Sequence, residues 1–243
     1  MRIPAISGII RRRILLNYRV SPDIAAALVP SRFRPKLVRG HAIAGICLIR
    51  LEEIRPKGLP GFLGISSENS AHRIAVEWEG DDGEAREGVF VPRRDTGSRL
   101  NSLAGGRLFP GVHHFSEFRA IDRDGNISLR VDAGDATPLV DLELRGSCDF
   151  PGTSVFASLT EASEFFEAGC IGYSARPDSC RLDGLLLKAS GWKVSPLEVL
   201  RAASSFYDDP SIFPPGSIAL DHALLMRDIS HEWHSEPEMR SDG

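Results

Sequence analysis

The sequence has no long apolar run and no apolar segment at its start, which limits the membrane roles that it can have. A membrane-spanning helix needs about 18 or more mostly apolar residues in succession, and no segment of the 243-residue chain provides them. A secretory signal needs a shorter apolar core near the N-terminus, and the sequence lacks that too. We therefore expect a cytoplasmic protein with no membrane partner.

Paired cysteines and other metal or cofactor motifs are also lacking. The four cysteines show no CxxC spacing and lie mostly in apolar segments, so we interpret them as reduced thiols: Cys47, Cys148, Cys170 and Cys180. His231 and His234 are spaced as in some zinc sites, and His113 and His114 are adjacent, but no cysteine or acid cluster accompanies either pair. We interpret these histidines as packed or surface residues and expect no metal and no cofactor.

Positive charge is not in excess. The chain has 29 Lys and Arg against 33 Asp and Glu, a net charge of -4. Because nucleic-acid binding requires a basic face, no nucleic-acid partner is expected. Hydrophobic residues make up 42% of the chain, which is ordinary for a globular protein long enough to bury a sizeable core. We predict a single domain over residues 1–234 and a disordered polar tail over 235–243.

The most informative segment is 86–95, which reads Arg-Glu-Gly-Val-Phe-Val-Pro-Arg-Arg-Asp. The apolar run at its centre is typical of a buried strand. Pro92 cannot donate a hydrogen bond to a neighbouring strand, so regular pairing should stop there. The strand then carries Arg93 and Arg94 out of a core. Two adjacent guanidiniums in an apolar site need carboxylates or a bound anion; the alternative is a solvated strand end.

A second strand precedes this segment. Apolar and polar residues alternate over 66–78, as in a half-buried strand, and a Gly-Asp-Asp-Gly turn at 80–83 joins the two strands as a hairpin. Counting back from the turn places Glu68 about opposite Arg94. Glu68 and Arg93 are therefore expected to point into one cavity. His72 is expected either to face the same cavity or to be a packed core histidine.

The rest of the pattern predicts many strands and few, short helices. Further strands are expected at 8–20, 42–51, 113–121, 127–132, 139–145, 170–175 and 182–190, and helices after Ser21, at 96–104 and at 160–168. Residues 197–206 fit a helix or a strand. This pattern favours an α+β chain that is mainly antiparallel β. A closed or nearly closed barrel would leave no long exposed edge.

The motif Arg86-Glu87-x-x-x-x-Pro92-Arg93-Arg94 resembles the acetoacetate decarboxylase signature Arg-Glu-x-x-x-x-Pro-Lys-Lys, with arginines in place of both lysines. Similar pieces follow in the same order at 18–23, 64–69 and 196–218, so the resemblance covers about residues 8–228. The chain looks closer still to a bacterial, DUF2071-like branch of that superfamily. The resemblance implies a cone-shaped antiparallel β-barrel with an interior site, and a homo-oligomer.

The resemblance also implies roles for individual residues. Arg93 matches the Schiff-base lysine, and Arg94 matches its neighbour. A guanidinium stays protonated and is a poor nucleophile, so imine chemistry is not expected here. The partner implied is a small organic acid, with Glu68 and Arg93 as catalytic residues and Arg94, Arg11, His72 and Glu87 as substrate-binding residues.

Three functions fit this set of charges. The first is an enzyme that acts on a small oxo acid, with Glu68 as general acid or base and arginines that stabilise an enolate. The chemistry would be that of a lyase, hydratase or tautomerase. The second is a protein that binds a small organic acid without turnover. The third is a buried ion network that only stabilises the fold.

Overall fold

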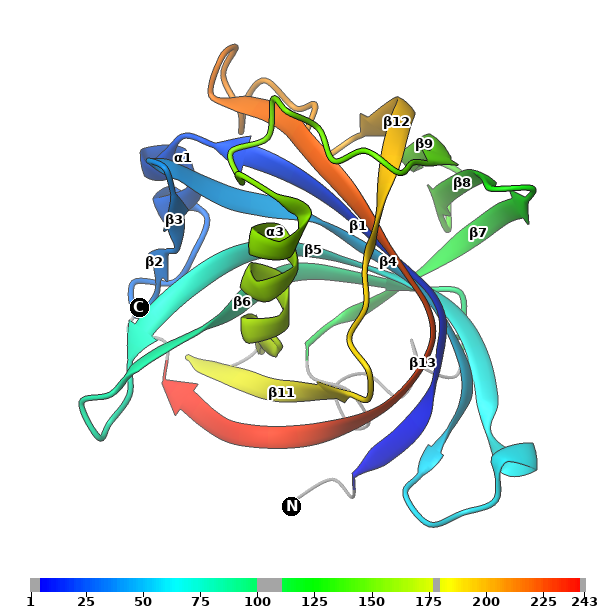
Figure 1. The fold of residues 1–243 in the computed structure, drawn as a ribbon. Helices are drawn as coiled ribbons and strands as arrows, with labels where there is room; N and C mark the ends of the chain where they lie inside the picture. Colours follow the sequence, from blue (N-terminus) through cyan, green and yellow to red (C-terminus); the bar gives the residue numbers. More distant parts are fainter. Residues whose placement is uncertain (1–4, 100–110, 177–179, 241–243) are drawn as a thin grey trace.

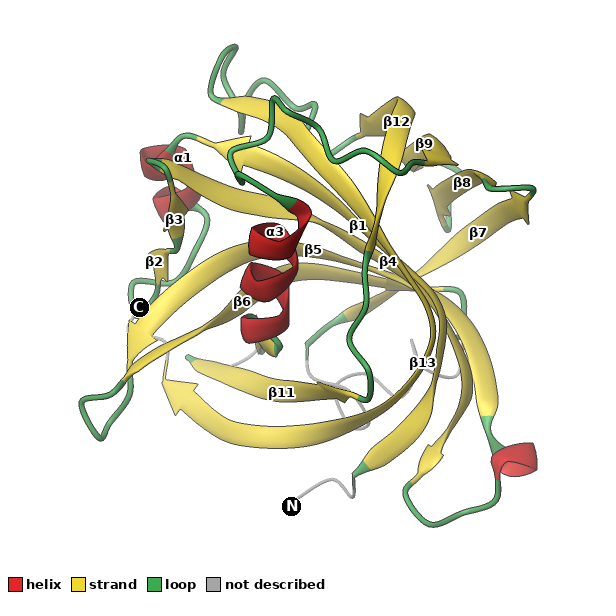
Figure 2. Cartoon of the chain, viewed as in Figure 1, coloured by secondary structure: helices red, strands yellow, loops and turns green. Residues whose placement is uncertain are grey.

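The computed structural model describes residues 5–99, 111–176 and 180–240, and strands dominate these residues (Figure 1, Figure 2). The helical elements are α1 (Pro22–Ala27), the 3-10 helix η1 (Gly61–Leu63) and α3 (Leu159–Ala168). None of the described helices is long and apolar enough to cross a membrane. The strands are β1 (Ile6–Val20), β2 (Arg34–Pro35), β3 (Leu37–Val38), β4 (His41–Pro56), β5 (Ile65–Glu79), β6 (Ala85–Thr96), β7 (His113–Arg123), β8 (Asn126–Ala133), β9 (Pro138–Gly146), β10 (Ile171–Ala175), β11 (Arg181–Ala189), β12 (Ser195–Ser204) and β13 (Ile218–Arg240).

The long strands pair into a closed ring. β13 pairs with β1, β1 with β4, β4 with β5 and β5 with β6, all antiparallel. β6 pairs in parallel with β10, and β10 continues through β11 back to β13. A second path joins β6 to β13 through β7, β8, β9 and β12. The prediction of a mainly antiparallel, barrel-like fold is confirmed.

The strands β13, β1, β4, β5 and β6 are shared, because both the ring and the second path connect their two ends. Both faces of these shared strands are largely buried, since each face belongs to a different core. Successive side chains of a strand point to opposite faces. Ile14 and Leu16 of β1 therefore join the larger core, which also contains Leu129 and Leu142 from the second path. Leu15 joins the smaller core, inside the ring. Continuous apolar runs such as that of β4 follow from this two-sided burial.

Helix α3 packs against the inside of the ring, in front of β5 and β6 in Figure 1. Its N-cap is Ser158, whose side chain accepts a hydrogen bond from the Glu161 backbone N–H at 3.1 Å. Its apolar face carries Ala162 and Phe166 into the smaller core. The helix thus fills one end of the ring and leaves space beyond it.

The strands expected within 8–20, 42–51, 66–78, 113–145 and 170–190 are present, as is the helix near 160–168. Residues 197–206, left open between helix and strand, belong mostly to β12. The helix expected over 96–104 falls largely outside the described residues. The disordered tail from residue 235 is wrong as far as Arg240, because β13 continues to that residue and pairs with β11.

Candidate functional site

The segment that ends in two arginines contains a β-bulge. Phe90 pairs with Ile74 of β5, but Arg93 already pairs with His72, so β6 has one residue more than β5 over this stretch. Pro92 lies within the bulge and cannot donate a ladder hydrogen bond, which makes it compatible with the interruption. The strand does not end at the proline, as the sequence had suggested, but continues to Thr96.

The bulge reverses which side chains face inward. Before it, Val89 and Val91 line the inside of the ring; after it, Arg94 does. Arg93 pairs with His72, and the side chains of paired residues lie on the same face of a sheet. The His72 side chain packs against Phe206 of the larger core, so Arg93 faces away from the cavity. The extra residue is the reason that two adjacent arginines lie on different sides of one strand.

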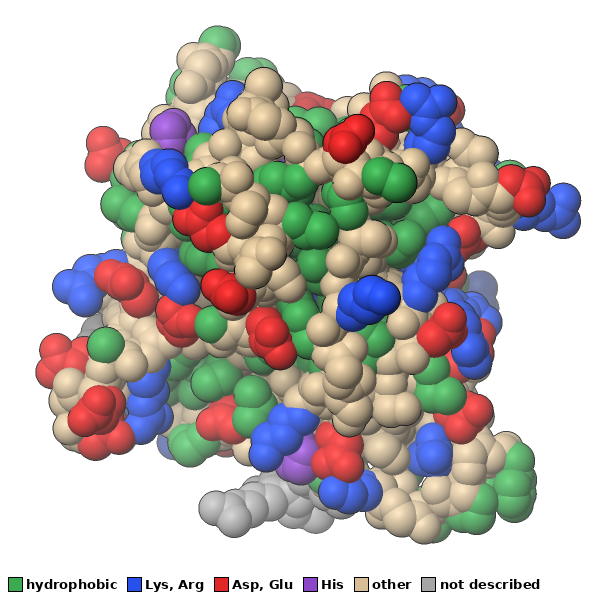
Figure 3. Space-filling view, viewed as in Figure 1, with side chains coloured by type: hydrophobic (Ala, Val, Ile, Leu, Met, Phe, Trp, Pro, Cys, Tyr) green, Lys and Arg blue, Asp and Glu red, His purple; other side chains and the backbone are tan. Residues whose placement is uncertain are grey.

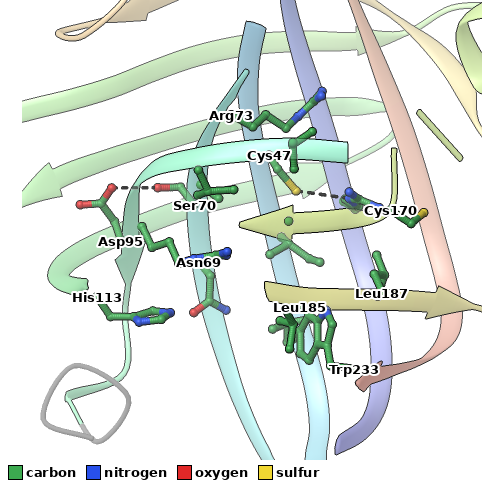
Figure 4. Close-up of a pocket in the computed structure, with 18 of the residues that line it drawn as sticks. Cys47, Asn69, Ser70, Arg73, Asp95, His113, Cys170, Leu185, Leu187 and Trp233 are labelled. Atoms are coloured by element: carbon green, nitrogen blue, oxygen red, sulfur yellow. Dashed lines mark hydrogen bonds between the residues drawn. The ribbon is translucent and has the colours of Figure 1, made fainter. Parts of the chain in front are cut away.

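A partly open cavity of about 140 Å³ lies inside the ring (Figure 4). Each strand of the ring contributes to its wall. Most of that wall is apolar and includes Ile49, Leu51, Val91, Leu185, Leu187 and Trp233. The polar groups are few and include the guanidiniums of Arg13, Arg73 and Arg94. An apolar pocket with a few polar groups is typical of a small-molecule site.

The three arginines have neutral partners. The Arg13 Nε donates to the Cys47 Sγ at 3.2 Å, and the Arg94 Nε donates to the Ser174 hydroxyl at 3.2 Å. Arg73 donates to the Asn17 side-chain oxygen and lies over the Phe166 ring, 4.7 Å from its centroid. Within residues 5–99, 111–176 and 180–240, no carboxylate forms an ion pair with any of the three.

This arrangement leaves positive charge around the cavity without a counter-charge from the described residues. Burial lowers the pKa of both Arg73 and Arg94 to about 10, which still leaves both guanidiniums protonated at neutral pH. Asp95 also touches the cavity, but its carboxylate accepts hydrogen bonds from Arg93 at 2.8 Å and from the Ser116 hydroxyl at 3.0 Å. The site can therefore attract a small anion.

A chain of buried side chains holds Arg73 in place. Asn17 accepts from Arg73 and donates through its Nδ2 to the Nε2 of His222 at 2.9 Å. The Nε2 is therefore the acceptor, which leaves the Nδ1 to donate to Asp221 at 2.6 Å. Burial lowers the pKa of His222, consistent with a neutral ring. The positive charge of Arg73 is thus not offset by the group that positions it, because that group is a neutral amide.

Comparison with protein families matches residues 10–212 to DUF2071, described as an uncharacterized conserved protein. The chain belongs to the DUF2071 family. The structural comparison below shows that its fold is like that of acetoacetate decarboxylases. No curated protein matches the sequence. The DUF2071-like assignment made from the sequence is confirmed.

Several solved structures share the fold of this DUF2071 protein. Acetoacetate decarboxylase from Legionella pneumophila aligns with a TM-score of 0.60 at 13% identity, over 97% of this chain and 88% of that one. An acetoacetate decarboxylase-like enzyme from Sphingomonas wittichii aligns with a TM-score of 0.60 at 11% identity, over 98% of this chain and 92% of that one. The enduracididine biosynthesis enzyme MppR, complexed with pyruvate, aligns with a TM-score of 0.55 at 12% identity, over 98% of this chain and 90% of that one. At such low identity these likenesses show the fold alone.

Glu68 does not face the cavity of this DUF2071 protein. It lies on β5 opposite Arg50, and its carboxylate is bound by Arg12 at 2.9 Å. Burial raises the pKa of Glu68, while the positive charges of Arg12 and Arg50 oppose that rise. The residue opposite Arg94 is Ala71, so the predicted hairpin register was wrong by three residues (71 minus 68). The expectation that Glu68 and Arg93 share the cavity is therefore wrong.

The other predicted residues are divided among different places. Arg94 lines the cavity. Arg11 is on the surface, where it pairs with Glu52 and Asp228. Glu87 forms an ion pair with Lys36 in a smaller space that adjoins the cavity beneath α3. The predicted set is therefore not one cluster.

The histidines also lie apart from one another. His72 is a core residue, 2% exposed, packed against the rings of Phe206 and Tyr207. His113 lines the cavity beside Arg94 of the neighbouring strand. The described residues contain no group of three or more potential metal ligands. His72 thus fits the core interpretation made from the sequence.

Sequence reasoning missed Arg13, Arg73 and Cys47. Arg73 was placed on the polar side of a half-buried strand, yet it is 4% exposed because a core covers each face of β5. Arg13 ends a run of three arginines and is followed directly by the apolar residues Ile14, Leu15 and Leu16. A usable signal was present in both cases, namely an arginine within a long apolar strand.

Proposed function

We propose that the cavity binds a small organic carboxylate that has an apolar portion, without Schiff-base chemistry. The supporting observation is the set of three guanidiniums, Arg13, Arg73 and Arg94, that no carboxylate of the described residues neutralises. A buried charge is stable only when an opposite charge or hydrogen bonds offset its desolvation. A ligand carboxylate would supply that opposite charge.

The size and wall of the cavity define the ligand further. Its volume of about 140 Å³ is close to that of an engineered protein cavity of about 150 Å³ that accepts benzene. The ligand would thus have about six to eight non-hydrogen atoms, with its apolar part against Leu185, Leu187 and Trp233. The structural neighbour MppR is described in complex with pyruvate, which supports small oxo acids as the first candidates.

Imine formation has little support from the residues present. None of the described residues that line the main cavity is a lysine. Lys36 lines the adjoining space, where it is paired with Glu87 and lies over the Phe165 ring, 4.5 Å from its centroid. Lys36 is therefore not placed to attack a carbonyl group bound in the main cavity.

Calorimetric titration of small oxo and alkyl carboxylic acids tests the proposal. Arg94→Gln is expected to weaken binding by about 1.5–3 kcal/mol, the range for charge-assisted hydrogen bonds. Arg11→Gln is the control, because it removes a surface guanidinium that pairs with Glu52 and Asp228 away from the cavity; it should leave binding unchanged. No binding to the wild-type protein, or equal losses in both variants, would refute the site.

Borohydride treatment in the presence of acetoacetate or pyruvate separates this proposal from imine chemistry. We expect no covalent adduct on the protein, because the arginines cannot form an imine. A trapped adduct on Lys36 would contradict the proposal, and peptide mass mapping would identify it. Acetoacetate decarboxylase serves as the positive control, since its mechanism uses a lysine imine.

Proton transfer to or from the bound acid is a second candidate, and His113 is the observation that favours it. Burial and then the charge of Arg94 lower the pKa of His113 to about 4, so the imidazole is neutral at pH 7 and can accept a proton. Exchange of α-hydrogens of bound pyruvate in D₂O, followed by NMR, tests this activity. His113→Gln should abolish exchange, whereas Glu68→Gln, outside the cavity, should not.

A further inference from the structure

The cavity also contains a thiol in a strongly positive environment. Cys47 lies on β4 with its side chain directed inward, next to Arg73 in Figure 4. Its Sγ accepts the hydrogen bond from the Arg13 Nε at 3.2 Å. Cationic neighbours favour the thiolate, which is the nucleophilic form of cysteine. The site does not consist of a cysteine alone. Arg73, which is 4% exposed, also lines it and has a buried Nε without a hydrogen-bond partner in the structure.

The sheet register places a gap between the thiol and Arg94. Cys47 pairs with Ala71, and Ala71 pairs with Arg94, so the three residues form one row across β4, β5 and β6. Neighbouring strands are about 4.8 Å apart, which puts the backbones at the two ends of the row about 10 Å apart. The side chain between them is only a methyl group. A small molecule over Ala71 therefore lies between the sulfur on one side and, on the other, the Arg94 side chain, whose Nε donates to Ser174 of β10.

The two cysteines that line the cavity have different surroundings. The Cys47 Sγ accepts a hydrogen bond from the Arg13 Nε at 3.2 Å. Cys170, which also lines the cavity, differs. Burial raises the pKa of its thiol, and its Sγ lies 3.8 Å from the Phe166 carbonyl oxygen. Of these two cavity cysteines, only Cys47 accepts a hydrogen bond from a cation.

We propose that Cys47 is a nucleophile and that small α,β-unsaturated carboxylates are its substrates. The carboxylate would bind Arg94, with Arg73 adding to the positive field, and the β-carbon would face the sulfur. The Sγ–Cβ bond forms as the C=C π bond breaks, and the thiol proton ends on the α-carbon. The addition is balanced without an oxidant or a cofactor. The proposal rests on the carboxylate site proposed above and adds a covalent step to it.

Acrylate and acrylamide test the inference, since both carry the same alkene but only acrylate carries the charge. Peptide mass spectrometry would measure the rate of adduct formation at each cysteine of the wild-type protein. Cys148 is exposed and provides a control within the same molecule. We expect the acrylate-to-acrylamide rate ratio to be at least about tenfold higher at Cys47 than at Cys148, as for a charge-steered reaction. Arg94→Gln should remove most of this difference, and Arg11→Gln, on the surface, should not.

A saturated analogue separates the two proposals. Propionate should bind the wild-type protein in calorimetry and should slow the acrylate reaction at Cys47 but not at Cys148. If propionate binds but the rate ratios at Cys47 and Cys148 are equal, or Cys47 gives no adduct, the nucleophile is refuted and the carboxylate site stands. If propionate does not bind and Cys47 shows no preference for acrylate, both proposals fail. These readings on the wild-type protein do not depend on the folding of a variant.

Discussion

At the scale of single residues, the surroundings of an arginine differ more than its position in the sequence suggests. Arg93 and Arg94 are adjacent, yet Arg93 pairs with Asp95 on one side of β6 and Arg94 lines the cavity on the other. The sequence could predict the charged pair and the strand that carries it. It could not predict which arginine faces inward, because a one-residue bulge reverses the alternation and Pro92 permits a bulge without requiring one.

The neutral partner of Arg73 leads to a prediction at the same scale. Asn17→Asp changes the amide that accepts from Arg73 into a carboxylate of nearly the same shape. The substitution provides the counter-charge that the cavity now lacks, so carboxylate binding should weaken at least about tenfold, or about 1.4 kcal/mol. Calorimetric titration measures the loss, and circular dichroism confirms that the variant folds.

Asn17→Ser is the companion variant, since it shortens the side chain without adding charge. It should weaken binding less than Asn17→Asp, although it also loosens Arg73. Tighter or unchanged binding in Asn17→Asp would show that the free charge of Arg73 plays no part in anion binding. It would leave Arg94 as the principal contact.

At the scale of elements, the strands were easier to predict than the faces that they present. Alternation and turn residues indicate strands correctly even where a second core covers them. The mistaken face of Arg73 has a topological cause. β5 lies in the part of the ring, from β6 to β13 through β5, β4 and β1, that the second path also spans, so a core covers each of its faces for most of its length. A single sequence carries no direct record of the pairing that buries the second face.

Helix α3 provides the prediction that belongs to this scale. The Ser158 hydroxyl caps the helix through the Glu161 N–H, so Ser158→Ala should lower the free energy of unfolding by about 1 kcal/mol. Urea denaturation measures the change. Glu164→Ala, at an exposed position of the same helix, is the control and should have a smaller effect. Equal effects of the two substitutions would mean that the cap contributes no more than an ordinary surface residue.

At the scale of the whole molecule, charge is distributed in opposite ways outside and inside. The face in Figure 3 carries interspersed acidic and basic side chains, and most described surface arginines pair with acids, as Arg11 does with Asp228 and Arg227 with Asp122. The cavity has three arginines and one acid already occupied by Arg93. The net charge of -4 therefore gives no indication of a positive interior. Composition could predict the surface, but only the closed ring collects these residues in one place.

The buried histidines give the molecule a predictable response to mild acid. Burial lowers the pKa values of His72, His113 and His231 to about 4, from an ordinary 6.5. For His72, the charge of Asp95 opposes this fall and that of Arg93 adds to it. As pH drops below 6.5, the unfolded chain takes up these protons before the folded chain does. The stability that the folded state gains by keeping these histidines neutral is fully present above pH 6.5 and is lost as the pH falls toward 4.

We expect the free energy of unfolding to decrease steeply between pH 6.5 and 4, by on the order of 1 to 3 kcal/mol for each buried histidine. Glu68 acts in the opposite direction, since burial raises its pKa and protonation then favours the folded state. Urea midpoints measured across this range test the prediction. His72→Phe keeps a ring against Phe206 and Tyr207 and should flatten the dependence, whereas replacement of the exposed His41 by Gln should not. If His72→Phe keeps the full slope while folding normally, the acid sensitivity must arise elsewhere, and the neutral state assigned to the other buried histidines, including His113 in the cavity, would lose its support.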